Sequence, residues 1–152
     1  MKNFKTATFE QLNTTQLYQI LALRSEVFVL EQDCAYQDMD GIDALSHHVW
    51  AETDQQLFAY ARILPPVLNP NEHVSIGRVV VAEAQRKDQW GKKLMQYAIN
   101  YALESFPEST IEISAQTYLT HFYQNLGFVN TGNFYLEDDI PHQTMIYRPT
   151  TE

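Results

Sequence analysis

Apolar and polar positions in the first half of the chain predict one amphipathic helix and one strand hairpin. Asn13 is a good N-cap with Gln16 three positions later, and apolar residues follow at helical spacing, so a helix is predicted over about 14–30. Residues 48–53 and 57–64 are apolar and β-prone on either side of a polar turn. This pattern predicts an antiparallel hairpin.

The second half alternates strands with helices. A β-branched run over residues 74–82 is short enough to be a buried central strand, and a helix is predicted from Lys92 until Pro107 stops it. The order is β-α-(ββ)-β-α-β-α-ββ, which predicts an α/β fold with ligands at the carboxyl ends of the later strands. The remaining predicted elements are a strand over 111–115, a helix over 118–126 and a strand pair starting at Phe128.

Length and charge limit the classes of function. With 152 residues, 45% of them hydrophobic, the chain is expected to form a single domain over residues 1–152. Its formal net charge of −9 has the wrong sign for a protein that holds nucleic acid by its surface, so no nucleic-acid partner is expected.

Cysteine content and hydropathy bear on the compartment. The single cysteine, Cys34, excludes an internal disulfide and suits a reducing compartment, and we interpret it as a small apolar residue. No apolar run has the length of a signal peptide or of a membrane span. We therefore expect a soluble, cytoplasmic protein with no membrane partner.

Residues 31–46 lack periodicity and form an acidic loop with four carboxylates between Asp33 and Asp43. The loop is either solvated or it steers a cationic amine, such as a polyamine, an amino sugar or a lysine-like group. A calcium loop is not expected, because Tyr36 and His47 stand where the first and twelfth ligands would be. The tandem His47 and His48 lack zinc-ligand partners, so no metal site is predicted.

Four of the ten cationic residues fall within eight positions at the start of the helix after the central strand: Arg86, Lys87, Lys92 and Lys93. Cations are disfavoured at a helix N-terminus unless an anion lies among them, and a bound phosphate would be such an anion. The alternative is a solvated basic turn. The spacing fits neither a P-loop nor a dinucleotide-binding fingerprint.

Residues 79–95 resemble the acetyl-coenzyme A (acetyl-CoA) segment of the GNAT N-acetyltransferases, whose core reads R-x-x-G-x-G/A after a Val-rich strand. Residues 122–128 are similar to the second signature of that superfamily, a Tyr-bearing helix that closes in Gly-Phe. Gln89 stands at the position of the first motif glycine. The resemblance covers roughly residues 5–148, and it extends to the ElaA-like branch through Leu23-Arg24, Val27-Phe28-Val29, Glu31-Gln32, Tyr36-Gln37-Asp38, Asp40-Gly41, Ile76-Gly77-Arg78-Val79 and Ile140-Pro141-His142.

This resemblance implies the GNAT acyl-CoA N-acyltransferase fold, in which a mixed, mostly antiparallel central sheet is splayed at the cofactor site and flanked by helices. It also implies direct transfer of an acetyl group from acetyl-CoA, as co-substrate, to an amine. The backbone of the central strand would pair with the pantetheine arm, and the basic turn would hold the pyrophosphate. The residues implied in cofactor binding are Val79, Val80, Val81, Arg86, Lys87, Gln89, Gly91, Lys92, Gln116 and Tyr123.

Among the catalytic candidates, Tyr123 is placed by the resemblance as the general acid that protonates the departing thiolate, with core packing as its structural alternative. The general base is less defined, and Glu31 and His48 are the candidates. Arg78 cannot act as a base, and it is expected to pair with the acidic loop or with a substrate carboxylate.

Two functions remain open. The first is an acetyl-CoA-dependent N-acetyltransferase, and the second is an acyl-CoA-binding regulatory or partner module without efficient turnover. The acceptor amine, on a small molecule or a protein, is not identified by the sequence. Homodimers are common in the superfamily, and the sequence does not decide whether this chain forms one.

Overall fold

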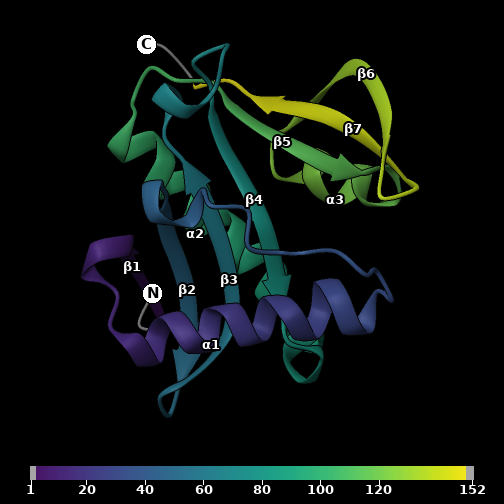
Figure 1. Cartoon of the computed structure of the whole chain (residues 1–152). Helices are drawn as coiled ribbons and strands as arrows, with labels where there is room; N and C mark the ends of the chain where they lie inside the picture. The colour runs from purple at the N-terminus through teal and green to yellow at the C-terminus, as the bar shows by residue number, and fades with distance from the viewer. Residues whose placement is uncertain (1–2, 150–152) are drawn as a thin grey trace.

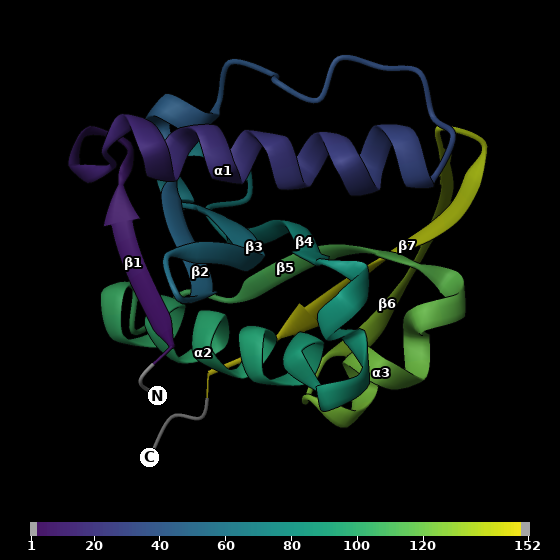
Figure 2. The ribbon, with the colours of Figure 1, turned by 90° about the horizontal axis from the view of Figure 1, so that it is seen from below.

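The computed structural model describes residues 3–149, so the two ends of the predicted 1–152 domain lie outside the described residues. A seven-stranded sheet has the order β1-β2-β3-β4-β5-β7-β6 (Figure 1). Helix α1 covers one face, and helices α2 and α3 lie on the other (Figure 2). The elements are β1 (Phe4–Thr8), α1 (Thr14–Arg24), β2 (His47–Thr53), β3 (Gln56–Leu64), β4 (Val74–Val81), α2 (Trp90–Ser105), β5 (Ile111–Gln116), α3 (Thr120–Asn125), β6 (Val129–Glu137) and β7 (Ile140–Tyr147).

Helix α1 begins as the sequence predicts and ends differently. The Asn13 side chain accepts a hydrogen bond from the Gln16 backbone N–H at 2.7 Å, which completes a capping box. After Arg24 the helix changes to a π-helix over Ser25–Glu31. This wider turn places Glu31 at the wall of the central cavity.

Shorter helical pieces connect the main elements. They are 3-10 turns at Phe9–Gln11, Asp43–Leu45, Pro66–Leu68, Glu83–Asp88 and Thr117–Leu119. Among residues 3–149, no helix combines the length and apolar character that crossing a membrane requires.

Two apolar clusters occupy the two faces of the sheet. The cluster on the α2 face includes Phe58, Leu94 and Met95, and the cluster on the α1 face includes Ile20 and Trp50. The periodicity that predicts α2 corresponds to its buried face, because Leu94, Met95, Ala98, Ile99 and Ala102 are all buried.

The sheet opens between β4 and β5. These two strands run parallel and pair only at their first residues, Val74 with Ile111 and Ser75 with Glu112. Beyond that point they diverge, while all other neighbouring strands are antiparallel. The mixed, mostly antiparallel, splayed sheet expected from the resemblance is confirmed.

Candidate active site

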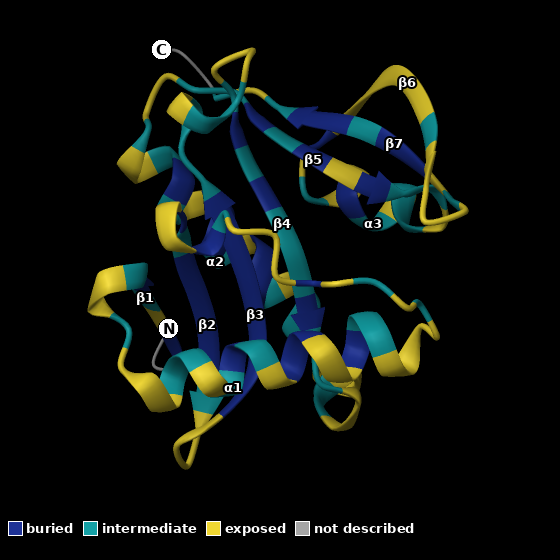
Figure 3. Ribbon diagram, in the orientation of Figure 1, coloured by how far each residue is buried: buried dark blue, intermediate teal, exposed yellow. Residues whose placement is uncertain are grey.

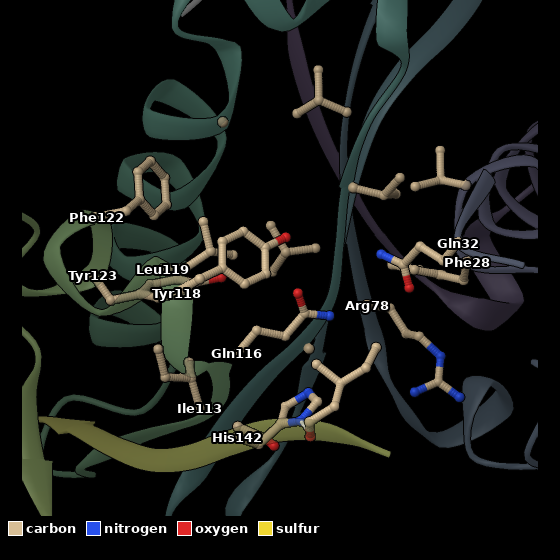
Figure 4. A pocket seen from close by; sticks show the side chains of 18 of the residues that line it. Phe28, Gln32, Arg78, Ile113, Gln116, Tyr118, Leu119, Phe122, Tyr123 and His142 are labelled. Atoms are coloured by element: carbon tan, nitrogen blue, oxygen red, sulfur yellow. Dashed lines mark hydrogen bonds between the residues drawn. The ribbon is translucent and has the colours of Figure 1, made fainter. Parts of the chain in front are cut away.

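A cavity of about 1040 Å³ lies where β4 and β5 diverge. One wall is the carboxyl-terminal part of β4 with the π-turn after α1, and the other is the end of β5 with the segment that leads into α3. Figure 4 shows Tyr118 and Tyr123 extending into this space from one side, with Arg78 on the other. The predicted residues that line it are Glu31, Val79, Val80, Val81, Arg86, Gln89, Gly91, Lys92, Gln116 and Tyr123.

Strand β4 presents main-chain groups to the cavity. On its other side it pairs with β3, Tyr60 opposite Val80 and Ala59 opposite Val81. Arg78 has a φ of +51° at a register irregularity of this ladder, which marks a bulge in β4. Beyond Ser75 the β5-facing edge has no strand partner among the described residues, so an extended ligand could add there as a strand.

The N-terminus of α2 opens into the same cavity. Gln89, the N-cap, has a φ of +58°, a left-handed conformation that glycine adopts at lower cost than glutamine. A Cβ at Gly91 would meet only Phe122, at 3.8 Å, so packing does not require a glycine there. The free N–H groups of this first turn, with Lys92 at the cavity wall, form an anion-binding end of the cavity.

Arg86 and Glu31 close one side of the cavity with a bidentate ion pair. Arg86 donates from both terminal nitrogens to the two carboxylate oxygens of Glu31, and its Nε donates to the Val81 carbonyl at 3.0 Å. This hydrogen bonding from Arg86 lowers the pKa of the Glu31 carboxyl. A carboxylate held in this way is a weaker proton acceptor than a free one.

Tyr123 is buried on α3, with its ring packed edge-on against Phe122 and Phe128. The packing role is realised, because Tyr123 belongs to the core cluster, and the same side chain also lines the cavity, where its catalytic role stays a prediction. Burial raises the pKa of the phenol to about 12. Its hydroxyl therefore remains protonated at neutral pH.

Gln116 and His142 face the cavity side by side, since they are register partners on β5 and β7 (Figure 4). His142 is 6% exposed, and its Nδ1 lies 2.7 Å from the carbonyl oxygen of Ile140. Its Nε2 lies 3.4 Å from the Glu137 carboxylate. Sequence reasoning missed Glu137 and gave His142 no role, although Ile140-Pro141-His142 is among the motifs that carry the resemblance.

The acidic loop is largely exposed, but three of its four Asp carboxylates are paired with arginines, so little of its charge is free to steer a ligand. Asp38, Asp40 and Asp43 bind Arg24, Arg62 and Arg78 in one connected network. Arg78 donates to Asp38 at 2.8 Å, which confirms the expected pairing of Arg78 with this loop. The network anchors residues 38–43 beside the cavity.

The structure corrects two of the predicted site residues. His48 is fully buried outside the cavity, where its ring nitrogens lie 2.6 Å from the Tyr60 hydroxyl and 2.9 Å from the Asp43 carbonyl, so it cannot reach a bound amine. Lys87 is exposed, as Arg86 and Lys92 are, but unlike those two residues it does not line the cavity. Lys93 lies over the Trp90 ring, 4.5 Å from its centre.

Among residues 3–149, no group of three or more His, Cys, Asp or Glu side chains is arranged to hold a metal ion. Cys34 lies in the cavity wall. Burial, with the negative charges of Asp138, Asp139 and Asp33, raises the pKa of its thiol. A thiol in this environment is a poor nucleophile.

Comparison with protein families matches residues 7–149 to the acetyltransferase (GNAT) domain. The UPF0039 protein sll0451 of Synechocystis is 40% identical over 147 residues, which are 96% of this chain and 95% of that protein. Protein ElaA of Escherichia coli K12 is 41% identical over 134 residues, 87% of each chain. The crystal structure of an acyl-CoA N-acyltransferase from Pseudomonas aeruginosa, 41% identical, superposes with a TM-score of 0.90 over 95% of this chain and 99% of that one.

Three observations thus indicate the same family: the sequence signatures, the splayed sheet and the relatives aligned over nearly the whole chain. The resemblance to the ElaA-like branch is confirmed by the 41% sequence identity with ElaA. The chain belongs to the GNAT acetyltransferase family, in its ElaA-like branch, and is an acyltransferase enzyme.

Proposed function

We propose that this protein transfers an acetyl group from acetyl-CoA directly to the nitrogen of a primary amine. The observation that carries the proposal is the opening between β4 and β5, which has the anion-binding turn of α2 at its wall and Tyr123 facing its interior. This geometry joins three functions in one cavity: holding an extended arm, holding phosphates and supplying a proton.

The cavity offers groups for the pantetheine arm and for the diphosphate of an acyl-CoA. The unpaired edge of β4 around Val79 and Val81 offers N–H and C=O groups to the amides of a pantetheine arm. The N-terminal turn of α2 offers backbone N–H groups to a diphosphate, with Lys92 as a nearby cation. Of the cations concentrated around this turn, Arg86 is paired with Glu31 and Lys93 lies over Trp90, so Lys92 is the cation that the cavity wall offers to a diphosphate.

Tyr123 supplies the proton that the leaving thiolate needs. Because burial raises its pKa to about 12, the phenol holds its proton at neutral pH and is available as a proton donor when the thiolate leaves. The Gln116 side chain lies in the same cavity and can orient the bound thioester by hydrogen bonding.

Direct attack by the amine is favoured over an acyl-enzyme. The one thiol of the chain, Cys34, has a raised pKa and is therefore mostly protonated at neutral pH. A route through an acetylated cysteine would need the thiolate form. The acceptor amine, on a small molecule or a protein, therefore attacks the thioester itself.

Thermal melts with acetyl-CoA, CoA and ATP at matched ionic strength test the binding part of this proposal. Ligand at about 100 times its Kd stabilises by about 2.7 kcal/mol, which corresponds to about 5–10 °C for a chain of this size. We expect this shift with acetyl-CoA and CoA but not with ATP. Equal shifts with all three, or none at millimolar ligand, contradict the proposal.

Thiol release from acetyl-CoA in the presence of an amine panel tests the transfer part. The expected result is amine-dependent release of one thiol for each acetylated amine. The same assay with longer acyl-CoA thioesters separates acetyl from other acyl donors. Binding without release in any combination supports instead the acyl-CoA-binding module without efficient turnover.

A further inference from the structure

His142 is the one imidazole among the described residues that line the cavity, and it is placed on the hairpin formed by β6 and β7. Its side chain is 7% exposed, and it is held between strands on both sides, opposite Gln116 on β5 and Tyr135 on β6. The ring stacks on Tyr135 with centres 6.0 Å apart. A ring held in this way has a fixed orientation toward the cavity.

The contacts of His142 define which nitrogen is basic. A carbonyl oxygen can only accept a hydrogen bond, so the 2.7 Å contact with the Ile140 carbonyl requires that Nδ1 carries the hydrogen. In the neutral ring Nε2 then has the free lone pair. The Glu137 carboxylate lies 3.4 Å from Nε2, where it stabilises the ring once Nε2 has accepted a proton.

The rim of the cavity near this pair is negative. Glu137 and Asp138 line the cavity at the turn between β6 and β7. The charges of Asp138 and Asp139 act on the Cys34 thiol, as does the charge of Asp33, which precedes Cys34 in the chain. Negative charge at an entrance raises the local concentration of cations, so it favours an alkylammonium ion over a neutral or anionic acceptor.

Other titratable groups of the cavity are less suited to receive a proton from the acceptor. Glu31 is bound to Arg86, which lowers the pKa of its carboxyl. Arg78, which faces the cavity from the other side in Figure 4, is bound to Asp38 and has no lone pair to offer. Tyr36 has a raised pKa, so its phenol is protonated at neutral pH.

We propose that Glu137 and His142 form the acceptor subsite, which takes a primary alkylamine in its protonated form, and that Nε2 of His142 removes the proton that blocks attack. This inference rests on the proposed function. The Glu137 carboxylate binds the ammonium group, and the proton moves to the adjacent imidazole. His142 is then a catalytic residue, because its Nε2 touches the reacting nitrogen.

The proton balance is complete with the residues of this cavity. His142 accepts one proton from the ammonium ion, and the freed nitrogen lone pair attacks the thioester carbonyl carbon. The C–N bond forms, the C–S bond breaks, and the sulfur takes the proton of the Tyr123 hydroxyl. The second proton that leaves the nitrogen restores the Tyr123 hydroxyl, and the proton on His142 passes to solvent at the exposed Glu137 carboxylate.

The test uses putrescine, a linear diamine, as acceptor in the thiol-release assay with wild type and His142→Gln. Near pH 7 we expect kcat/KM to fall by about 10²–10⁴-fold in the variant. The deficit should shrink by about tenfold for each pH unit toward the amine pKa of about 10, because alkaline solution supplies the free amine that His142 otherwise generates. A deficit that is constant with pH shows a structural role and overturns the proposal, as does wild-type activity in the variant.

Glu137→Gln is the second variant, at a 56% exposed side chain whose replacement leaves the core intact. Its expected effect is a KM for putrescine about tenfold higher, with a smaller change in kcat. His73→Gln is the matched control, because His73 lies 3.4 Å from Glu112 in a similar His–Glu pair outside the cavity. The control should leave kcat/KM and its pH dependence unchanged, and a loss equal to that of His142→Gln contradicts the assignment.

The acetyl-CoA melt separates this inference from the proposed function. If acetyl-CoA does not shift the melt of the wild type, the proposed function itself fails. If acetyl-CoA stabilises wild type and His142→Gln equally but the wild type acetylates no alkylamine, the acceptor subsite is wrong and the acyl-CoA site stands. Equal stabilisation together with the pH-dependent deficit supports both.

Discussion

The strands β1–β4 and the strands β5–β7 form one sheet, but they are built in different ways. Strand β3 is buried along nearly its whole length, whereas every residue of β6 is exposed or half-buried (Figure 3). The first region lies between α1 and α2 and carries the buried network of Arg24 with the acidic loop. The second region ends in an open edge strand.

The difference separates two tasks of the site. The tightly packed region offers backbone, the β4 edge and the N-terminus of α2, and backbone placement needs a rigid support. The more open region offers side chains, namely Tyr123, Gln116, His142 and Glu137, beside an exposed rim. Under the proposed function, donor binding therefore depends on packing of the first region, while transfer chemistry depends on individual groups of the second.

Removing the buried guanidinium of Arg24 should have the largest effect on stability. Arg24 is 0% exposed and bonds Asp38 and Asp43 at 2.7 and 2.8 Å, so Arg24→Ala leaves two carboxylates underpaired in the interior. We expect a loss of about 3 kcal/mol, or about 6–12 °C in Tm, measured by thermal and urea unfolding.

Lys5→Met is the matched control for Arg24→Ala. Lys5 also forms an ion pair, with Glu52 at 2.6 Å, but its side chain is 56% exposed. Its loss should cost less than about 1 kcal/mol. Equal losses in the two variants contradict the view that the buried network holds the first region together.

Acid should weaken the first region through the same network. Burial by itself raises the pKa of Asp40, but hydrogen bonds from Arg62 and from the Ile42 backbone lower it to about 2. Because the folded pKa lies below the usual value of 3.8, the contribution of Asp40 is present above about pH 4 and is lost as pH falls toward 2. After screening by solvent, we expect Asp40 to contribute about 1 kcal/mol to the free energy of unfolding.

The measurement is the free energy of unfolding of wild type and Asp40→Asn between about pH 6 and pH 3. Asp40→Asn should be less stable than wild type at the higher pH. The difference between their free energies of unfolding should narrow as the pH falls. A gap that widens as the pH falls has the wrong sign and contradicts the pairing of Asp40 with Arg62.

Changes on β6 should have the smallest effect. Leu136 is 69% exposed on this edge strand, so Leu136→Ser removes little buried apolar surface. We expect a change in stability within about 0.5 kcal/mol and an unchanged melt response to acetyl-CoA. A large destabilisation indicates that β6 is covered in solution, for example in a homodimer. Gel filtration of wild type and Leu136→Ser then shows whether a dimer is present.

Sequence reasoning predicts the elements of both regions because their signals are local. The apolar spacing that predicts α2 comes from residues that are all buried on one face of that helix. The π-turn after Arg24 is missed, because a change of hydrogen-bond register leaves no mark in apolar spacing. Bounds are predicted for four strands, over 48–53, 57–64, 74–82 and 111–115, and they agree with β2, β3, β4 and β5 to within a residue.

The candidate site is predicted in part. Motif positions identify the β4 edge, the α2 turn and Tyr123 as lining the cavity, since each of the two motifs is contiguous in sequence. The Glu137–His142 pair requires the register of β5, β7 and β6, which no local pattern specifies. His48 is misassigned for the same reason, because its partners Tyr60 and Asp43 meet it only in the folded sheet.

The most direct test of direct acetyl transfer in this cavity is thiol release by Tyr123→Phe, with the melt response to acetyl-CoA measured on the same sample. The variant removes one hydroxyl and keeps the ring that packs against Phe122 and Phe128. The account predicts an unchanged acetyl-CoA shift with kcat lower by about 10²–10⁴-fold. Wild-type turnover in Tyr123→Phe would contradict the assignment of Tyr123 as the proton donor to the departing thiolate.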